Sequence, residues 1–86
     1  MMTTSEKPLM LEVYSPEERM FSDMVNLVQL PGTDGSFEVL KNHAPMIATL
    51  KKGVIRVKDI YLQEHTFEVK GGVVEVLNNQ VTVLVT

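Results

Sequence analysis

The stretch that decides the fold is Val73–Leu84, VVEVLNNQVTVL, where two apolar runs flank the pair Asn78-Asn79. Asparagine tolerates the left-handed backbone conformation that a two-residue type I′ hairpin turn requires. A turn at this pair aligns Glu75 with Thr82 on a solvent-facing side, because residues paired across two strands share a face. The opposite face then carries four valines, namely Val74, Val76, Val81 and Val83. The sequence therefore predicts an antiparallel hairpin with one buried face.

The same register leaves three larger apolar residues, Val73, Leu77 and Leu84, on the solvent-facing side. Either the N-terminal strand or the segment Lys58–Glu64 covers them, or they form an apolar docking patch. The segment Lys58–Glu64 is itself ambiguous, because it could extend the preceding strand or form the tip of a long hairpin.

Outward from this hairpin, the rest of the chain also reads as short strands. β-branched residues dominate the apolar runs, Pro and Gly interrupt them at short intervals, and no apolar helical period persists. We expect strands at Leu9–Tyr14 and Met24–Leu30, with a break at Ser22-Asp23 between them. This pattern predicts an all-β fold, a flattened antiparallel sandwich or barrel.

Length and composition indicate one modest domain, residues 1–86, in which the short polar segment 1–8 reads as a frayed terminus. With 8 Lys and Arg against 11 Asp and Glu, the net charge of −3 argues against non-specific nucleic-acid binding and docking on anionic membranes. The longest apolar runs are too short to insert into a membrane. There is no cysteine, so we expect no disulfide or thiolate site, and the cytoplasm is the default location.

A second distinctive stretch, Leu30–Pro45, is too rich in Pro, Gly, Asp and Asn to form one regular element. It reads as two tight loops flanking a short apolar strand, Phe37–Leu40. The pattern allows two interpretations. The loops set backbone turns, or Thr33–Ser36 and Lys41–Pro45 are neighbouring loops at one end of the sandwich that contact another protein.

The sequence contains no catalytic, metal or cofactor constellation. The two histidines, His43 and His65, lie 22 residues apart without a ligand spacing, and no cysteine is available. A serine, His43 and Asp34 can be combined on paper, but no nucleophile-elbow sequence surrounds Ser22 or Ser36. The glycines lack the Lys-Ser/Thr and the helix of a phosphate-binding loop. We therefore expect a non-catalytic chain without cofactor or metal.

In order and spacing, nearly the whole chain after Pro8 resembles the N-terminal domain of the ε subunit of F-type ATP synthase. The matching segments are LEVYSPE (11–17), MFS (20–22), LPGTDGSF (30–37), HAP (43–45), KGVIRV (52–57), FEVKGGVVEV (67–76) and VTVL (81–84). No one of these motifs is decisive, but their ordered combination is highly specific.

The resemblance implies a flattened antiparallel sandwich of about ten short strands and a non-catalytic rotor subunit of the central stalk. Such a subunit binds the γ subunit and the c-ring and couples proton-driven rotation to ATP synthesis. It lies at the cytoplasmic face of the bacterial plasma membrane without inserting into it. In the family the two loops face the c-ring, which here gives Thr33, Asp34, Gly35, Ser36, Lys41, Asn42, His43, Ala44 and Pro45. The γ subunit contacts another surface, matched here by Ser15, Met46, Ala48 and Val54.

Three departures from the family pattern bear on these expectations. Ser36 stands where relatives often carry Glu, which removes one acidic c-ring contact, and Lys41-Asn42 replaces the usual Pro-Gly before the His-Ala-Pro motif. The chain also stops at Thr86, where typical members continue into a two-helix C-terminal domain. Whether the chain is naturally short or an isolated domain, we expect neither inhibition by helix extension nor that domain's nucleotide site.

A stand-alone β-sandwich recognition module for peptides or carbohydrates is the alternative from a different class. Such a module would use the same loops, but it more usually presents an aromatic-lined groove. With Tyr14, Tyr61 and three Phe, this chain has few aromatic residues for one.

Overall fold

The chain folds into β-strands without a helix in the part that the structure, a computed structural model, describes, residues 7–86. The segment 1–8, expected to fray, therefore lies largely outside the described residues. The strands are β1 (Leu9–Tyr14), β2 (Arg19–Gly32), β3 (Gly35–Val39), β4 (Met46–Leu50), β5 (Gly53–Asp59), β6 (Glu64–Val69), β7 (Gly72–Leu77) and β8 (Gln80–Val85). The predicted all-β class is confirmed, with eight strands in these residues where about ten were expected.

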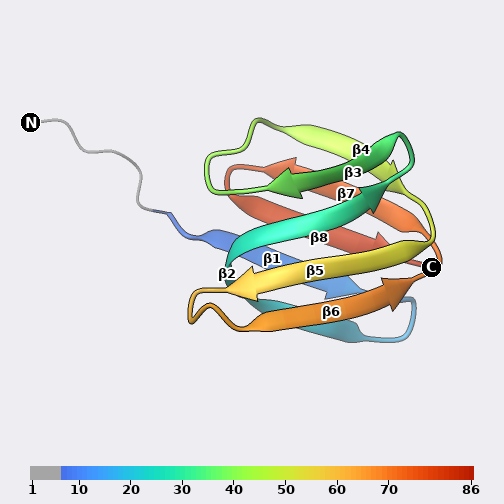
Figure 1. Ribbon diagram of the computed structural model, residues 1–86, viewed down its shortest axis with the longest axis horizontal. Helices are drawn as coiled ribbons and strands as arrows, with labels where there is room; N and C mark the ends of the chain where they lie inside the picture. Colours follow the sequence, from blue (N-terminus) through green and yellow to red (C-terminus); the bar gives the residue numbers. More distant parts are fainter. Residues whose placement is uncertain (1–6) are drawn as a thin grey trace, which may run out of the picture.

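The strands form two layers, as Figure 1 shows. The front sheet contains β3, β2, β5 and β6 in this order, and the back sheet contains β4, β7, β8 and β1. β1 also pairs antiparallel with the first half of β2, which joins the two sheets into a flattened barrel. Not every pair is antiparallel, because β1 runs parallel to β8.

β2 is one long strand of 14 residues, so the predicted break at Ser22-Asp23 is wrong. Ser22 pairs with Glu12 of β1, and its hydroxyl donates a hydrogen bond of 3.2 Å to the Glu12 carboxylate. The pairing with β5 slips between Val25 and Leu27. An irregularity of this kind bends a strand, and here it lies between the half of β2 that pairs with β1 and the half that pairs with β3.

The hairpin of β7 and β8 has the predicted register, with Glu75 opposite Thr82 and the Asn78-Asn79 turn between the strands. Both asparagines adopt positive φ, 52° and 63°, as a type I′ turn requires. The four inward valines are at most 1% exposed. A second cluster of inward residues faces them from the front sheet, and its fully buried members include Val28, Leu30, Ile55 and Val57.

Within residues 7–86 no segment covers the solvent side of this hairpin, so of the two alternatives the covering by β1 or by Lys58–Glu64 is wrong. Val73, Leu77 and Leu84 are 41%, 46% and 55% exposed. β1 lies beside β8 in the same sheet instead of across its face. The segment Lys58–Glu64 completes β5, turns, and begins β6, which settles its ambiguity in favour of a hairpin tip.

The Asp59 carboxylate organises that hairpin tip. It accepts hydrogen bonds from the backbone amides of Tyr61 (2.8 Å) and Gln63 (2.9 Å), and it lies 3.0 Å from Nε2 of His65. The hydrogen bond with His65, followed by the one from the Gln63 amide, lowers the pKa of Asp59 below its ordinary value. The inward side of His65 packs edge-on against the Phe21 ring, so the tip is tied to the core.

Candidate partner-binding surfaces

The first predicted loop is a tight turn at Thr33-Asp34, between the paired residues Gly32 and Gly35. Its position is fixed by Thr33, whose backbone amide and hydroxyl both bond the Thr49 carbonyl of β4, at 3.0 and 3.1 Å. Gly32 is required here, because an added Cβ would lie 2.6 Å from the Gly35 carbonyl oxygen. The turn therefore holds the Asp34 side chain at the exposed corner between the two sheets.

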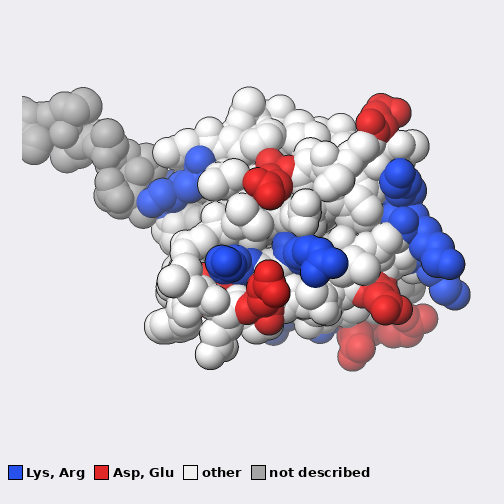
Figure 2. Space-filling model, in the orientation of Figure 1, with Lys and Arg blue, Asp and Glu red and all other residues white. Residues whose placement is uncertain are grey.

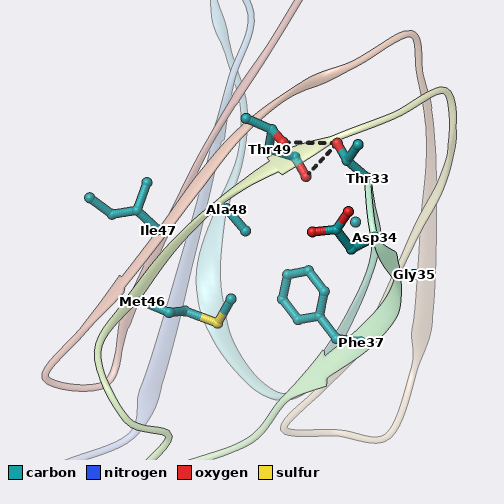
Figure 3. Close-up of a pocket in the computed structure, with 9 residues that line it drawn as sticks. Thr33, Asp34, Gly35, Phe37, Met46, Ile47, Ala48 and Thr49 are labelled. Atoms are coloured by element: carbon teal, nitrogen blue, oxygen red, sulfur yellow. Dashed lines mark hydrogen bonds between the residues drawn. The ribbon is translucent and has the colours of Figure 1, made fainter.

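A cleft of about 520 Å³ opens between β3 and β4, beside this turn. Figure 3 shows Phe37 and Met46 pointing toward one another into the cleft, whereas Ile47 points away from it. In the part of the chain that the structure describes, β3 pairs only with β2, so the cleft runs along a free strand edge. Phe37 is the only aromatic residue that lines the cleft, which is therefore not an aromatic-lined groove.

The second predicted loop is a four-residue turn, Leu40–His43, followed by Ala44 and Pro45. The His43 amide donates to the Leu40 carbonyl at 3.2 Å, and Asn42 adopts a φ of 68°. Nδ1 of His43 lies 2.7 Å from the Ala44 carbonyl oxygen, which holds the half-buried imidazole against its own loop. The turn is retained although Lys41-Asn42 replaces the expected Pro-Gly.

The two loops lie at opposite ends of β3, so the prediction that they are neighbours at one end is wrong (Figure 1). β3 has five residues, and a strand of that length spans roughly 16 Å. A partner that contacts both Thr33–Ser36 and Lys41–Pro45 must therefore lie along the β3 edge. His43 lies at the other end of β3 from Asp34 and Ser36, so these three residues cannot form a catalytic triad.

The four residues matched to γ do not form one patch. Met46 and Ala48 are half-buried and pack against the core from β4. Val54 lies on the outer face of the front sheet, opposite Glu68. Ser15 caps the β1–β2 turn, where its side-chain oxygen accepts a hydrogen bond of 3.2 Å from the Glu18 amide. The structure thus separates these candidates onto three different surfaces.

The outer faces of the two sheets differ in chemistry. The front sheet exposes the charged residues Glu38, Arg56, Lys58, Glu64 and Glu68. Figure 2 shows basic and acidic side chains interspersed on the face toward the viewer. The back sheet instead exposes apolar side chains, led by Ile47 at 73% and Leu84 at 55%. Ile47 was not singled out from the sequence. The alternation in Met46–Leu50 carries the signal, because Ile47 shares its face with the polar Thr49.

Within residues 7–86, no group of three or more His, Asp or Glu side chains could hold a metal ion. No helix that could cross a membrane occurs in the same range. What these residues offer is surface for contact, in three parts: the β3 edge with its two loops, the cleft, and the apolar outer face of the back sheet.

Residues 8–86 match the family of the ATP synthase delta/epsilon chain, beta-sandwich domain. The chain belongs to this family. It is 40% identical over 83 residues to the ATP synthase epsilon chain of Chlorobaculum tepidum, covering 96% of this chain and 94% of that relative. It is 42% identical over 82 residues to the epsilon chain of Pelotomaculum thermopropionicum, but covers only 59% of that relative's length.

Two solved structures share the fold. A chain of the Euglena gracilis mitochondrial ATP synthase superposes with a TM-score of 0.86 at 18% identity. The superposition covers 91% of this chain and 50% of the Euglena gracilis chain. A chain of the Tetrahymena thermophila mitochondrial ATP synthase central stalk and c-ring gives a TM-score of 0.79 at 13% identity, covering 96% of this chain and 66% of its own. Family membership confirms the resemblance read from the sequence and makes the chain an epsilon-type, non-catalytic stalk subunit. The absence of a C-terminal helical domain stays a prediction.

Proposed function

We propose that this chain is a central-stalk subunit of a rotary ATP synthase that binds both the γ subunit and the c-ring. In that role it transmits proton-driven rotation to ATP synthesis, as a peripheral protein at the cytoplasmic face of the bacterial plasma membrane. The observation that carries the proposal is coverage: this one sandwich corresponds to 94% of the Chlorobaculum tepidum epsilon chain. The proposal therefore assigns both partner contacts to surfaces of this sandwich.

The c-ring contact in this proposal runs along the β3 edge. The two loops assigned to the c-ring, Thr33–Ser36 and Lys41–Pro45, end this edge on either side. Along this edge Ser36 and Glu38 are exposed, while Val39 is buried. A polar edge of this kind suits the polar loops that a membrane ring presents to water, and it needs no insertion into lipid.

The γ contact in this proposal uses the apolar outer face of the back sheet and the adjoining strand β4. Ile47, Val73 and Leu84 are each more than 40% exposed there, with Thr49 opposite Val73 and the charged Glu75 opposite Ile47. Val73 and Leu84 are cross-strand partners, and contiguous exposed apolar side chains are a feature of protein interaction sites. Met46 and Ala48 lie on β4 together with Ile47. Val54 lies on the charged outer face of the front sheet, so the proposed contact does not include it.

The test is a titration of the labelled chain with the purified γ subunit of Chlorobaculum tepidum, followed by NMR and calorimetry. Ile47→Asp replaces the most exposed apolar side chain of the back sheet with a charge, opposite Glu75, and should weaken γ binding at least tenfold, on the order of the cost of losing one apolar anchor. Thr66→Asp is the matched control, because Thr66 is an exposed strand residue on the charged outer face. Equal affinities for the two variants would reject the back sheet as the γ-binding face.

A further inference from the structure

We propose that Asn79, in the β7–β8 turn, is a positioning residue that fixes the 40–45 loop in the shape presented to the c-ring. The inference rests on the proposed function for its partner, but its structural part stands on contacts within this chain. Asn79 and Asn42 are 37 residues apart in sequence, and their side chains meet at the end of the sandwich where both turns lie.

The turn at Leu40–His43 needs outside support because of its own sequence. A four-residue turn with positive φ at its third position has type II geometry, which favours Pro at the second position and Gly or Asn at the third. Asn42 satisfies the third position with a φ of 68°. Lys41 occupies the second position and has no ring to preset its φ, so the unsupported turn loses more conformational entropy when it forms.

Asn79 supplies that support through both ends of its amide side chain. Its Oδ1 accepts a hydrogen bond of 2.6 Å from the Asn42 backbone amide, and its Nδ2 donates to Oδ1 of Asn42 at 3.2 Å. The Asn79 backbone carbonyl also accepts a bond of 2.8 Å from the Met10 amide. One turn residue therefore joins the 40–45 loop, the start of β1 and the last hairpin.

Burial distinguishes Asn79 from its neighbour in the turn. Asn79 is 8% exposed, whereas Asn78 is exposed, although both adopt the same left-handed backbone conformation. A buried amide group costs free energy unless it is hydrogen-bonded, and the bonds to Asn42 offset this cost for the buried side chain of Asn79. The loop residues His43, Ala44 and Pro45 then line a hollow of about 350 Å³ together with both turn asparagines.

The experiment compares Asn79→Gly with Asn78→Gly in the full chain. Glycine accepts the positive φ at either position, so both variants keep the turn, and only the first removes the bonds to Asn42. We expect hydrogen exchange of the Asn42 backbone amide to accelerate about tenfold in Asn79→Gly and to change less than twofold in Asn78→Gly. Equal exchange rates at Asn42 in the two variants would overturn the positioning role.

The second readout is binding to the purified c-ring of Chlorobaculum tepidum in detergent. Asn79→Gly should weaken binding about threefold to tenfold, and Asn78→Gly should not weaken it. Faster exchange at Asn42 with unchanged affinity would overturn the link from Asn79 to the partner. A wild-type chain that fails to bind the c-ring would instead reject the proposed function and leave the exchange result standing.

Discussion

Two adjacent valines in β7 provide a direct test of how the sandwich is stabilised. Val74 is fully buried, and its pairing partners are Val83 and Ala48 on the inward face of the back sheet. Val73 is 41% exposed on the outer face, opposite Leu84 and Thr49. The substitutions Val73→Ala and Val74→Ala remove the same atoms from the same strand, so their difference reports the packing and burial of the two faces.

The expected difference follows from the atoms removed. At position 74, two buried carbons contribute about 1.6 kcal/mol at about 0.8 kcal/mol each. A residual cavity of roughly 30 Å³ adds about 0.7 kcal/mol at 24 cal/mol per Å³. Val74→Ala should therefore lower the free energy of unfolding by about 2 kcal/mol more than Val73→Ala, because a substitution at the solvent side should change it by only about 0.5 kcal/mol.

Urea unfolding followed by circular dichroism measures both variants, and thermal melting provides a second estimate. For a domain of this size, about 2 kcal/mol corresponds to a melting temperature lower by about 8–16 °C. The slopes of the urea transitions should be equal, because neither change alters the surface exposed on unfolding by much. Equal destabilisation by the two substitutions would refute the assignment of faces, and with it the exposed apolar surface assigned to γ.

Two further predictions concern the β5–β6 hairpin tip. The hydrogen bond with His65 is the largest cause that holds the pKa of Asp59 below 3.8. The ionised carboxylate therefore stabilises the folded state above pH 3.8, and this stabilisation is lost as the pH falls towards the lowered pKa. Asp59→Asn should therefore be less stable than wild type at pH 7 in urea titrations, with a shallower loss of stability below about pH 4; parallel pH profiles would contradict this. Leu62 is 67% exposed at a φ of 67°, so Leu62→Asn should raise the melting temperature by relieving about 1 kcal/mol of backbone strain, and a lower value would contradict it.

Much of the fold was available from short stretches of sequence. The alternation in Val73–Leu84 and the turn chemistry of Asn78-Asn79 give the last hairpin and its register, because both depend on residues that are neighbours in the chain. The two tight loops around β3 were predicted for the same reason. The ordered motifs indicated the family, and the family model matches residues 8–86.

The tertiary structure alone decided which residues meet and which stay exposed. Ser22-Asp23 reads as a break until β1 pairs with it, and the bulge at Val25–Leu27 that turns β2 between sheets leaves no local signal. The contact of Asn42 with Asn79 joins turns 37 residues apart, which no local pattern can specify. Sequence periodicity fixes the side of a strand on which a residue lies, because that is a local property. Whether another layer covers that side depends on non-local packing, and so the open outer face of the back sheet emerged only from the fold.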